Sequence, residues 1–174
     1  MPVRPIYLSQ RGKYRIGIFD IRFNDNGQFV SIYDKISQRE VLAAGKHANV
    51  LTVYEDKPHE FDNWNIDAYY REKHWEVSDI QSVEVVEKGP VRACLRIKSR
   101  FLNSTIVQSV YIYRDMARID IKNNIDWHEA QLLLRVSFPV DIHADEATYD
   151  IQYGNVKRPA HYNTSWDFAR FEFF

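Results

Sequence analysis

The sequence has little of several features that would place a protein in a special class. It contains one cysteine, Cys94, so no intramolecular disulfide can form. Six glycines and six prolines are too few for a collagen-like, low-complexity or disordered chain. No apolar run approaches the roughly 20 residues of a membrane-spanning helix, and the stretch 1–15 lacks the apolar centre of a secretion signal. We therefore expect a soluble, cytoplasmic protein with no membrane partner.

Massed charge of one sign is also missing. The 23 basic and 24 acidic residues are scattered along the chain and give a formal net charge of −1. This balance does not favour nucleic acid as a partner. The sequence has no glycine-rich phosphate loop and no Gly-x-Ser-x-Gly motif, which excludes two large groups of enzymes. Cys94 lies within an alternating stretch, where it is expected to be a small strand side chain rather than a nucleophile.

What the sequence does contain is a series of β-strand patterns separated by polar turns. Aromatic and β-branched residues fill 14–23, and the turn residues of 24–27 predict a hairpin with the next strand. Alternation with a period of two is clearest at 118–127, where Ile119, Ile121 and Ile125 share a face that we expect to be buried. Lys122 and Asp126 lie on the opposite face and are expected to point outward.

Two further segments show the same alternation, and one does not. The residues expected to face a core are Val91, Ala93, Leu95 and Ile97 after a turn at 88–90, and then Leu132, Leu134, Val136 and Phe138. The segment 105–113 is apolar or aromatic on both faces, which predicts a central or covered strand. No stretch has a helical apolar period. The pattern predicts an all-β fold, an antiparallel β-sandwich over 14–174, with 1–13 as an N-terminal arm or an arbitrary chain boundary.

One long segment, 54–70, interrupts this strand pattern. It carries five acidic residues and five aromatics without any apolar period, so we predict an ordered loop with a strand on each side. Aromatic side chains are costly to leave in water, so the loop is expected to fold back on a sheet or on a partner surface. It is either a surface loop held by its own aromatics or the rim of a carbohydrate site or domain interface. The spacing alone does not choose between them.

Several strings resemble the C-terminal β-domain of the α-mannosidases of glycoside hydrolase family 38. They are SIYDKISQREVLAAGKHANVLTVYEDKPHEFDNWNID, GPVRACLRIKSRFLNSTI, DWHEAQLLLRVSFPVDI and DEATYDIQYGNVKRPAHYNTSWDFARFE. The similarity extends from about Tyr14 onward, with the strings in the order and spacing of the family. Asn63 and Asn65 depart from the family pattern, and so does the tripeptide 160–162.

The resemblance implies a function for the chain as part of a longer enzyme. The fold would be a portion of a galactose-mutarotase-like super-sandwich. The parent would be a zinc-dependent, retaining α-mannosidase acting on terminal α-mannosides, with its nucleophile and acid/base in an N-terminal domain absent here. This chain would brace that catalytic domain and help shape its sugar site. By itself it is expected to be inactive, with no catalytic residue and no metal or other cofactor of its own.

Two loops supply the candidates for contact with the sugar or with the catalytic domain. They are Asp62, Trp64, Asp67, Arg158, His161, Asn163 and Trp166. The first loop is acidic and the second is richer in bases, so we predict that they meet at one end of the sandwich, with Arg158 against the carboxylate of Asp62 or Asp67. Such an ion pair is as consistent with a purely structural lock between two loops as with a sugar site.

Metal binding and other functions are weaker alternatives. His143 and Asp145 have the His-x-Asp spacing that the family uses for zinc, but their context resembles a connecting segment of the C-terminal domain, so no metal site is assigned. The chain is alternatively a free-standing carbohydrate-binding module. An aldose epimerase is suggested by fold alone, which is a weak argument for function. Expected partners are the catalytic domain, an α-mannoside and, through an unpaired sheet edge, a second copy of the chain.

Overall fold

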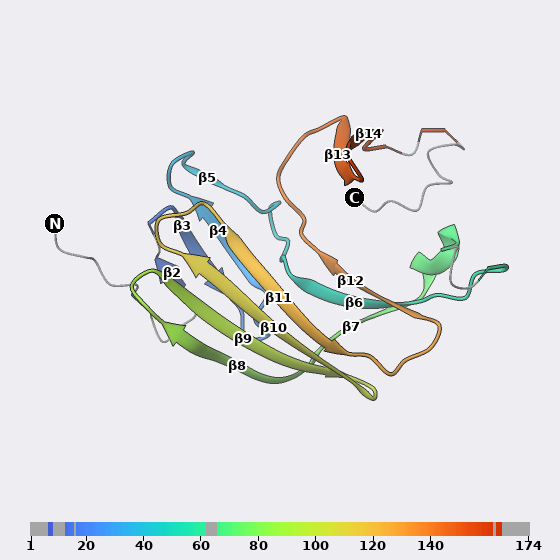
Figure 1. Ribbon diagram of the computed structural model, residues 1–174, viewed down its shortest axis with the longest axis horizontal. Coiled ribbons are helices and arrows are strands. Elements are labelled where there is room, and N and C mark those ends of the chain that lie inside the picture. Colours follow the sequence, from blue (N-terminus) through green and yellow to red (C-terminus); the bar gives the residue numbers. More distant parts are fainter. Residues whose placement is uncertain (1–6, 9–12, 16, 62–65, 162, 165–174) are drawn as a thin grey trace.

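The computed structural model describes residues 7–8, 13–15, 17–61, 66–161 and 163–164, and almost all regular structure in these ranges is β-strand (Figure 1). The strands are β1 (Tyr7–Leu8), β2 (Lys13–Arg15), β3 (Phe19–Phe23), β4 (Phe29–Asp34), β5 (Arg39–Glu40), β6 (Val50–Glu55), β7 (His74–Glu76), β8 (Asp79–Lys88), β9 (Arg92–Phe101), β10 (Ser104–Tyr113), β11 (Ile119–Asp126), β12 (Leu132–Ser137), β13 (Glu146–Ile151) and β14 (Gly154–Pro159). A short 3-10 helix, η1 (Ala68–Glu72), precedes β7. None of the helices in the described ranges has the length and apolar character that crossing a lipid bilayer requires.

In the described ranges all strand pairs are antiparallel, and they form four sheets. Their strand orders are β1-β2-β3-β4-β5, β11-β10-β9-β8, β12-β6-β7 and β13-β14. The predicted all-β antiparallel fold is confirmed. Strand β10 lies between β9 and β11, as its two apolar faces predicted, and every second residue along it is buried.

Two hydrophobic cores lie on one face of the four-stranded sheet. Near one end, Val110 and Ile112 of β10 pack in a core with Ile21 of β3 and Phe29 of β4. Toward the other end, Ile106 packs with Val53 of β6 and with Val77. These three β10 residues are separated by even numbers of positions and therefore project from the same face. The four-stranded sheet is one layer of the sandwich, and the two sheets built on β3–β4 and β6 together form the other.

Buried amides lie between the two cores. Asn49 and Gln108 are each 3% exposed and exchange two hydrogen bonds, with N···O distances of 3.1 and 3.0 Å. The amide of Gln108 also donates to Asn123 Oδ1 at 2.9 Å. Buried amides that are mutually satisfied in this way fix the register of the two layers, because any slip would leave them unpaired.

The turn between β3 and β4 is held by hydrogen bonds to Asn24 and requires a glycine at position 27. Asn24 Oδ1 accepts the backbone N–H groups of Asn26 and Gln28, at 3.1 and 2.9 Å. Gly27 has φ +76°, and a Cβ on it would lie 2.6 Å from the Ile97 side chain of the opposite layer. Glycine is required here both for the backbone conformation and for the close packing of the turn on the core.

Three details of the predicted strands are wrong. The segment 14–23 is not one strand, because β2 pairs antiparallel with β3 and a bend at 17–18 separates them. Val91 is 65% exposed because it lies in the turn before β9. Ile125 was expected to be buried; it lies opposite Ile106 in the register but is 43% exposed, because β11 is the edge strand of its sheet.

The structure agrees with most of the other predictions for these strands. Ala93, Leu95 and Ile97 are at most 4% exposed, and Lys122 and Asp126 are exposed. Cys94 is buried within β9, and burial raises the pKa of its thiol, as expected for a structural cysteine. On β12 the prediction is half right. Leu132 and Leu134 pack on the second core, but Val136 is 45% exposed, and Phe138, just after the strand, is 42% exposed.

Candidate functional site

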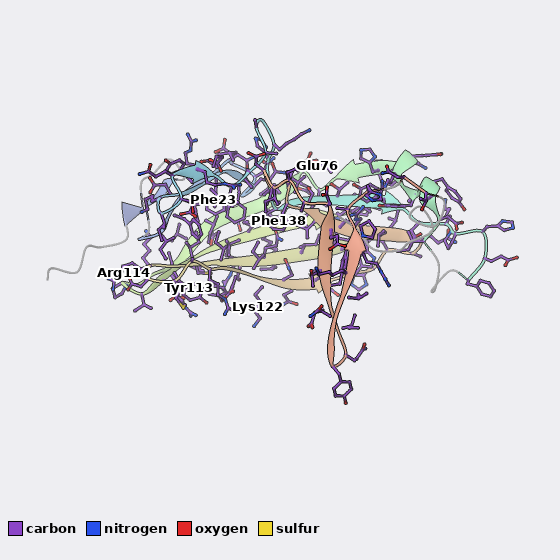
Figure 2. All side chains as sticks on the ribbon, turned by 90° about the horizontal axis from the view of Figure 1, so that it is seen from above. Phe23, Glu76, Tyr113, Arg114, Lys122 and Phe138 are labelled. Atoms are coloured by element: carbon purple, nitrogen blue, oxygen red, sulfur yellow. The ribbon has the colours of Figure 1, made fainter. Side chains whose placement is uncertain are left out.

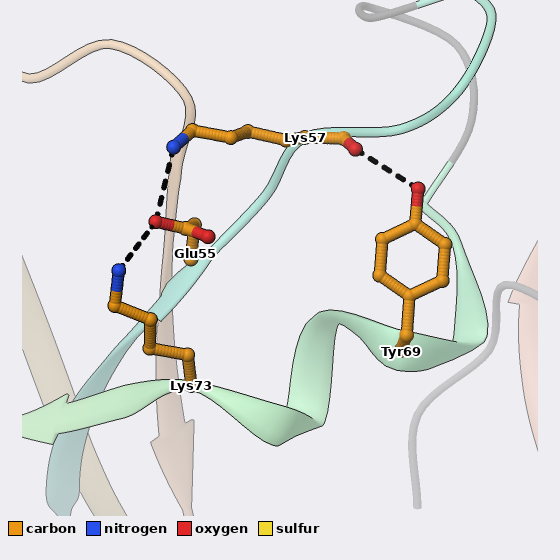
Figure 3. Close-up of polar contacts among 4 residues, drawn as sticks. All are labelled: Glu55, Lys57, Tyr69 and Lys73. Carbon is orange, nitrogen blue, oxygen red and sulfur yellow. Dashed lines mark hydrogen bonds and ion pairs between the residues drawn. The ribbon is translucent and has the colours of Figure 1, made fainter.

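The long loop after β6 is closed by contacts among its own residues. Lys73 and Lys57 approach the Glu55 carboxylate from two sides, with Nζ···Oε1 distances of 2.8 and 3.0 Å (Figure 3). The hydroxyl of Tyr69, on η1, lies 3.0 Å from the Lys57 carbonyl oxygen. Glu55 ends β6 and Lys73 follows η1, so these bonds join the two ends of the loop. The predicted ordered loop with a strand on each side is confirmed for its described residues.

Asp67 is the candidate residue of this loop that the structure describes. Its Oδ2 lies 2.6 Å from the Tyr69 hydroxyl and accepts the backbone N–H of His59 at 2.8 Å. The Tyr69 bond, followed by the His59 bond, lowers the pKa of Asp67, and the bonds from Lys73 and Lys57 lower the pKa of Glu55. Both carboxyl groups are therefore ionised at neutral pH. A glycosidase acid needs a raised pKa, so neither group is suited to that role.

A cluster of aromatic rings and arginines anchors η1 to β12. The guanidinium of Arg135 donates to the Tyr70 hydroxyl and lies 5.6 Å from the ring centroids of both Tyr70 and Tyr54. The Tyr54 and Tyr70 rings meet edge to face at 5.3 Å, and Tyr70 is 5% exposed. Arg135 is not among the residues predicted from the sequence. The available signal was a single charged residue within the apolar run 132–136.

A groove runs along β12 beside this cluster. It has a volume of about 660 Å³ and is lined by Thr52, Tyr54, Arg135 and the residues 136–140. Val136 on β12 and Phe138, which directly follows this strand, both line the groove, and this accounts for their exposure. Cation, hydroxyl and apolar groups therefore share one concave surface.

The second candidate loop begins on β14. Arg158 is half-buried and pairs with Ala147 across the β13–β14 hairpin, while His161 and Asn163 follow the strand and are exposed. The backbone N–H of Asn163 points to Nδ1 of His161 at 3.5 Å. Both η1 and the hairpin lie away from the five-stranded N-terminal sheet along the long axis of the molecule (Figure 1). The other candidates, Asp62, Trp64 and Trp166, lie outside the described residues, and the contact of Arg158 with Asp62 or Asp67 stays a prediction.

The described residues bear on whether this chain could hold a metal ion. No group of three His, Cys, Asp or Glu side chains in it comes together in a way that could hold a metal ion. His143 and Asp145 are exposed and lie in the connection between β12 and β13. Each carboxyl pKa in the described ranges that departs from its ordinary value is lowered, those of Asp34, Glu40 and Asp120 as well as the two above.

Comparisons with known proteins agree with the motifs. Alpha-mannosidase G of Dictyostelium discoideum is 36% identical over 87% of this chain, and Alpha-mannosidase 2C1 of Homo sapiens is 31% identical over 99% of it. An Alpha-mannosidase of Saccharomyces cerevisiae is 34% identical over 72%. This chain spans only 14%, 17% and 12% of these three proteins. Residues 16–173 match the model for the glycosyl hydrolases family 38 C-terminal domain, and the chain belongs to this family.

Proposed function

We propose that this chain is the non-catalytic C-terminal β-domain of a zinc-dependent, retaining α-mannosidase that acts on terminal α-mannosides. The observation that carries the proposal is the match of residues 16–173 to the family 38 C-terminal domain, together with relatives named alpha-mannosidases. Because the chain spans 14% and 17% of two such relatives, most of the enzyme lies in other parts of the polypeptide. The role of this part is to brace the catalytic domain and to contribute to the rim of the sugar site.

The donor set of the described residues does not fit a zinc site. A catalytic zinc needs three protein ligands and an open position, and no such group of side chains is found in the described ranges. The carboxylate of Asp67 is held by Tyr69 and His59, and that of Glu55 by Lys57 and Lys73. In the proposal, both the metal and the reacting carboxylates belong to the catalytic domain.

The loop contacts support a bracing and positioning role. Glu55, Asp67 and Tyr69 tie the loop to itself, and Arg135 ties η1 to β12, so contacts within the chain hold this surface in place. A preorganised surface loses little conformational entropy when another domain packs on it. In the proposal, Arg158, which is half-buried on the β13–β14 hairpin, contributes its guanidinium to the surface shared with the catalytic domain and the sugar.

The first test compares the chain with the whole enzyme. The purified 174-residue chain should not hydrolyse an aryl α-mannoside, with or without added zinc. The full polypeptide encoded by the gene that contains this sequence should hydrolyse it. A chelator should abolish the activity of the full polypeptide. Chelator-sensitive turnover by the chain alone would contradict the proposal. Measurable mannose binding by the chain alone, with no activity in the full polypeptide, would favour a carbohydrate-binding module instead.

The second test concerns Arg158. In the full polypeptide, Arg158→Ala should lower kcat/KM for the aryl α-mannoside at least tenfold while shifting the thermal midpoint little, because the change removes a positioned charge at the site rim. Lys157→Ala is the matched control, because Lys157 is exposed on the opposite face of β14. Its Nζ forms an ion pair with Oε2 of Glu146 at 3.4 Å. Unchanged kinetics in Arg158→Ala would remove Arg158 from the site.

A further inference from the structure

The β13–β14 hairpin stands apart from the layered body of the molecule. Figure 2 shows it extending away from the stacked sheets, and within the described part of the chain each of its strands pairs with the other alone. A two-stranded hairpin with no third strand is marginally stable in water. A projecting hairpin of this kind is expected to pack against something else in the functional protein.

The tip of the hairpin is apolar and strongly exposed. Tyr153 has a relative exposure of 109%, and Ile151 of 47%. Tyr153 also has a φ of +63°, in a backbone region that residues other than glycine seldom adopt. Gly154 is the next residue in the sequence. Tyrosine is one of the residue types enriched among the strongest contributors to protein interfaces.

The charges at the tip indicate what the partner surface offers. Across the hairpin Asp150 lies opposite Asn155, and Ile151 lies opposite Gly154. Asp150 is the only charged residue within 150–155. Two apolar side chains with one carboxylate beside them fit an apolar pocket that has a basic residue on its rim.

We infer that the hairpin tip, Ile151 and Tyr153, is an anchor that inserts into an apolar pocket on the catalytic part of the same α-mannosidase polypeptide. The inference rests on the proposed function and adds the surface through which the bracing occurs. We take the pocket to lie in the same polypeptide because this chain matches only 14% and 17% of the length of two relatives. A protein of that length has a large additional part that can contact the hairpin tip. The carboxylate of Asp150 then meets the basic rim and orients the insertion.

The test uses hydrogen exchange in the full polypeptide that contains this chain. The backbone amides of 152–154 should be protected in the wild type, and the double change Ile151→Ser with Tyr153→Ser should lower that protection roughly 30-fold, as loss of a central interface contact does. Asn155→Ser is the matched control, because Asn155 is polar and adjacent to the tip, and it should leave the protection unchanged. Unchanged exchange at Ile106 and Val110 in the cores would verify that the double variant is folded.

The outcomes separate this inference from the proposed function. Protection that is lost only in the double variant supports the anchor. Free exchange at 152–154 in an active α-mannosidase, or equal protection in the wild type and the double variant, would overturn the anchor and leave the proposed function intact. A full polypeptide without α-mannosidase activity would overturn both.

Discussion

The isoleucine pair of β10 and β11 provides a direct test of the sandwich. Ile106 and Ile125 are opposite each other in the register and point to the same face, but Ile106 is 0% exposed and Ile125 is 43% exposed. Changing each to alanine removes the same three carbon atoms from neighbouring positions. Any difference in the lost stability therefore reports the difference in burial between a central and an edge strand.

The expected losses follow from that burial. At about 0.8 kcal/mol per buried carbon group, Ile106→Ala loses ~2.4 kcal/mol of transfer free energy. The cavity left beside Val53 and Val77 raises the total to about 3–4 kcal/mol. Ile125 is a little over half buried and opens to water, so no closed cavity forms, and its change should cost about 1 kcal/mol.

Urea denaturation followed by far-UV circular dichroism measures both losses. The midpoint should shift while the slope stays constant, which shows that stability rather than compactness of the unfolded state has changed. Equal losses from the two variants would refute the assignment of β11 as an edge strand. A loss in Ile125→Ala that grows with protein concentration would indicate that a second copy covers this edge.

Three further predictions follow from single contacts. Gly27→Ala should destabilise the chain by about 2 kcal/mol in thermal melts because of its positive φ and the contact with the core, whereas Gly154→Ala, with no atom within 4 Å of the added carbon, should be nearly neutral. Burial raises the pKa of Glu40, but hydrogen bonds from a serine hydroxyl and three backbone N–H groups outweigh it and leave the pKa lowered. A carboxyl with a lowered folded pKa stabilises above its unfolded pKa and loses that contribution as the pH falls, so melts below about pH 4.5 should show a steeper loss in the wild type than in Glu40→Gln. Gln108→Leu should cost about 1–3 kcal/mol in urea, because it leaves the buried amide of Asn49 without its partner.

Much of the candidate site depends on contacts between residues distant in sequence. The order of the 54–70 loop was predicted from its aromatics, and Tyr70 is indeed buried. Its partner Arg135 is 65 residues away, and only the packing of η1 on β12 brings the two together. The same holds for Glu55 and Lys73, which are separated by 18 residues. Loop closure of this kind depends on the path of the backbone, and a string of residue types does not specify that path.

The sequence by itself determined the fold class, the main strands and the family, because a period of two, turn residues such as those of 24–27, and ordered strings of unusual residues are local properties. It also identified which face of a strand points inward, as for Leu95 and Ile97. Only the tertiary structure decided which strands lie at an edge, and hence that Ile125, Val136 and Phe138 are exposed. The reason is physical: alternation specifies a face, whereas burial depends on how many neighbouring strands and layers cover that face.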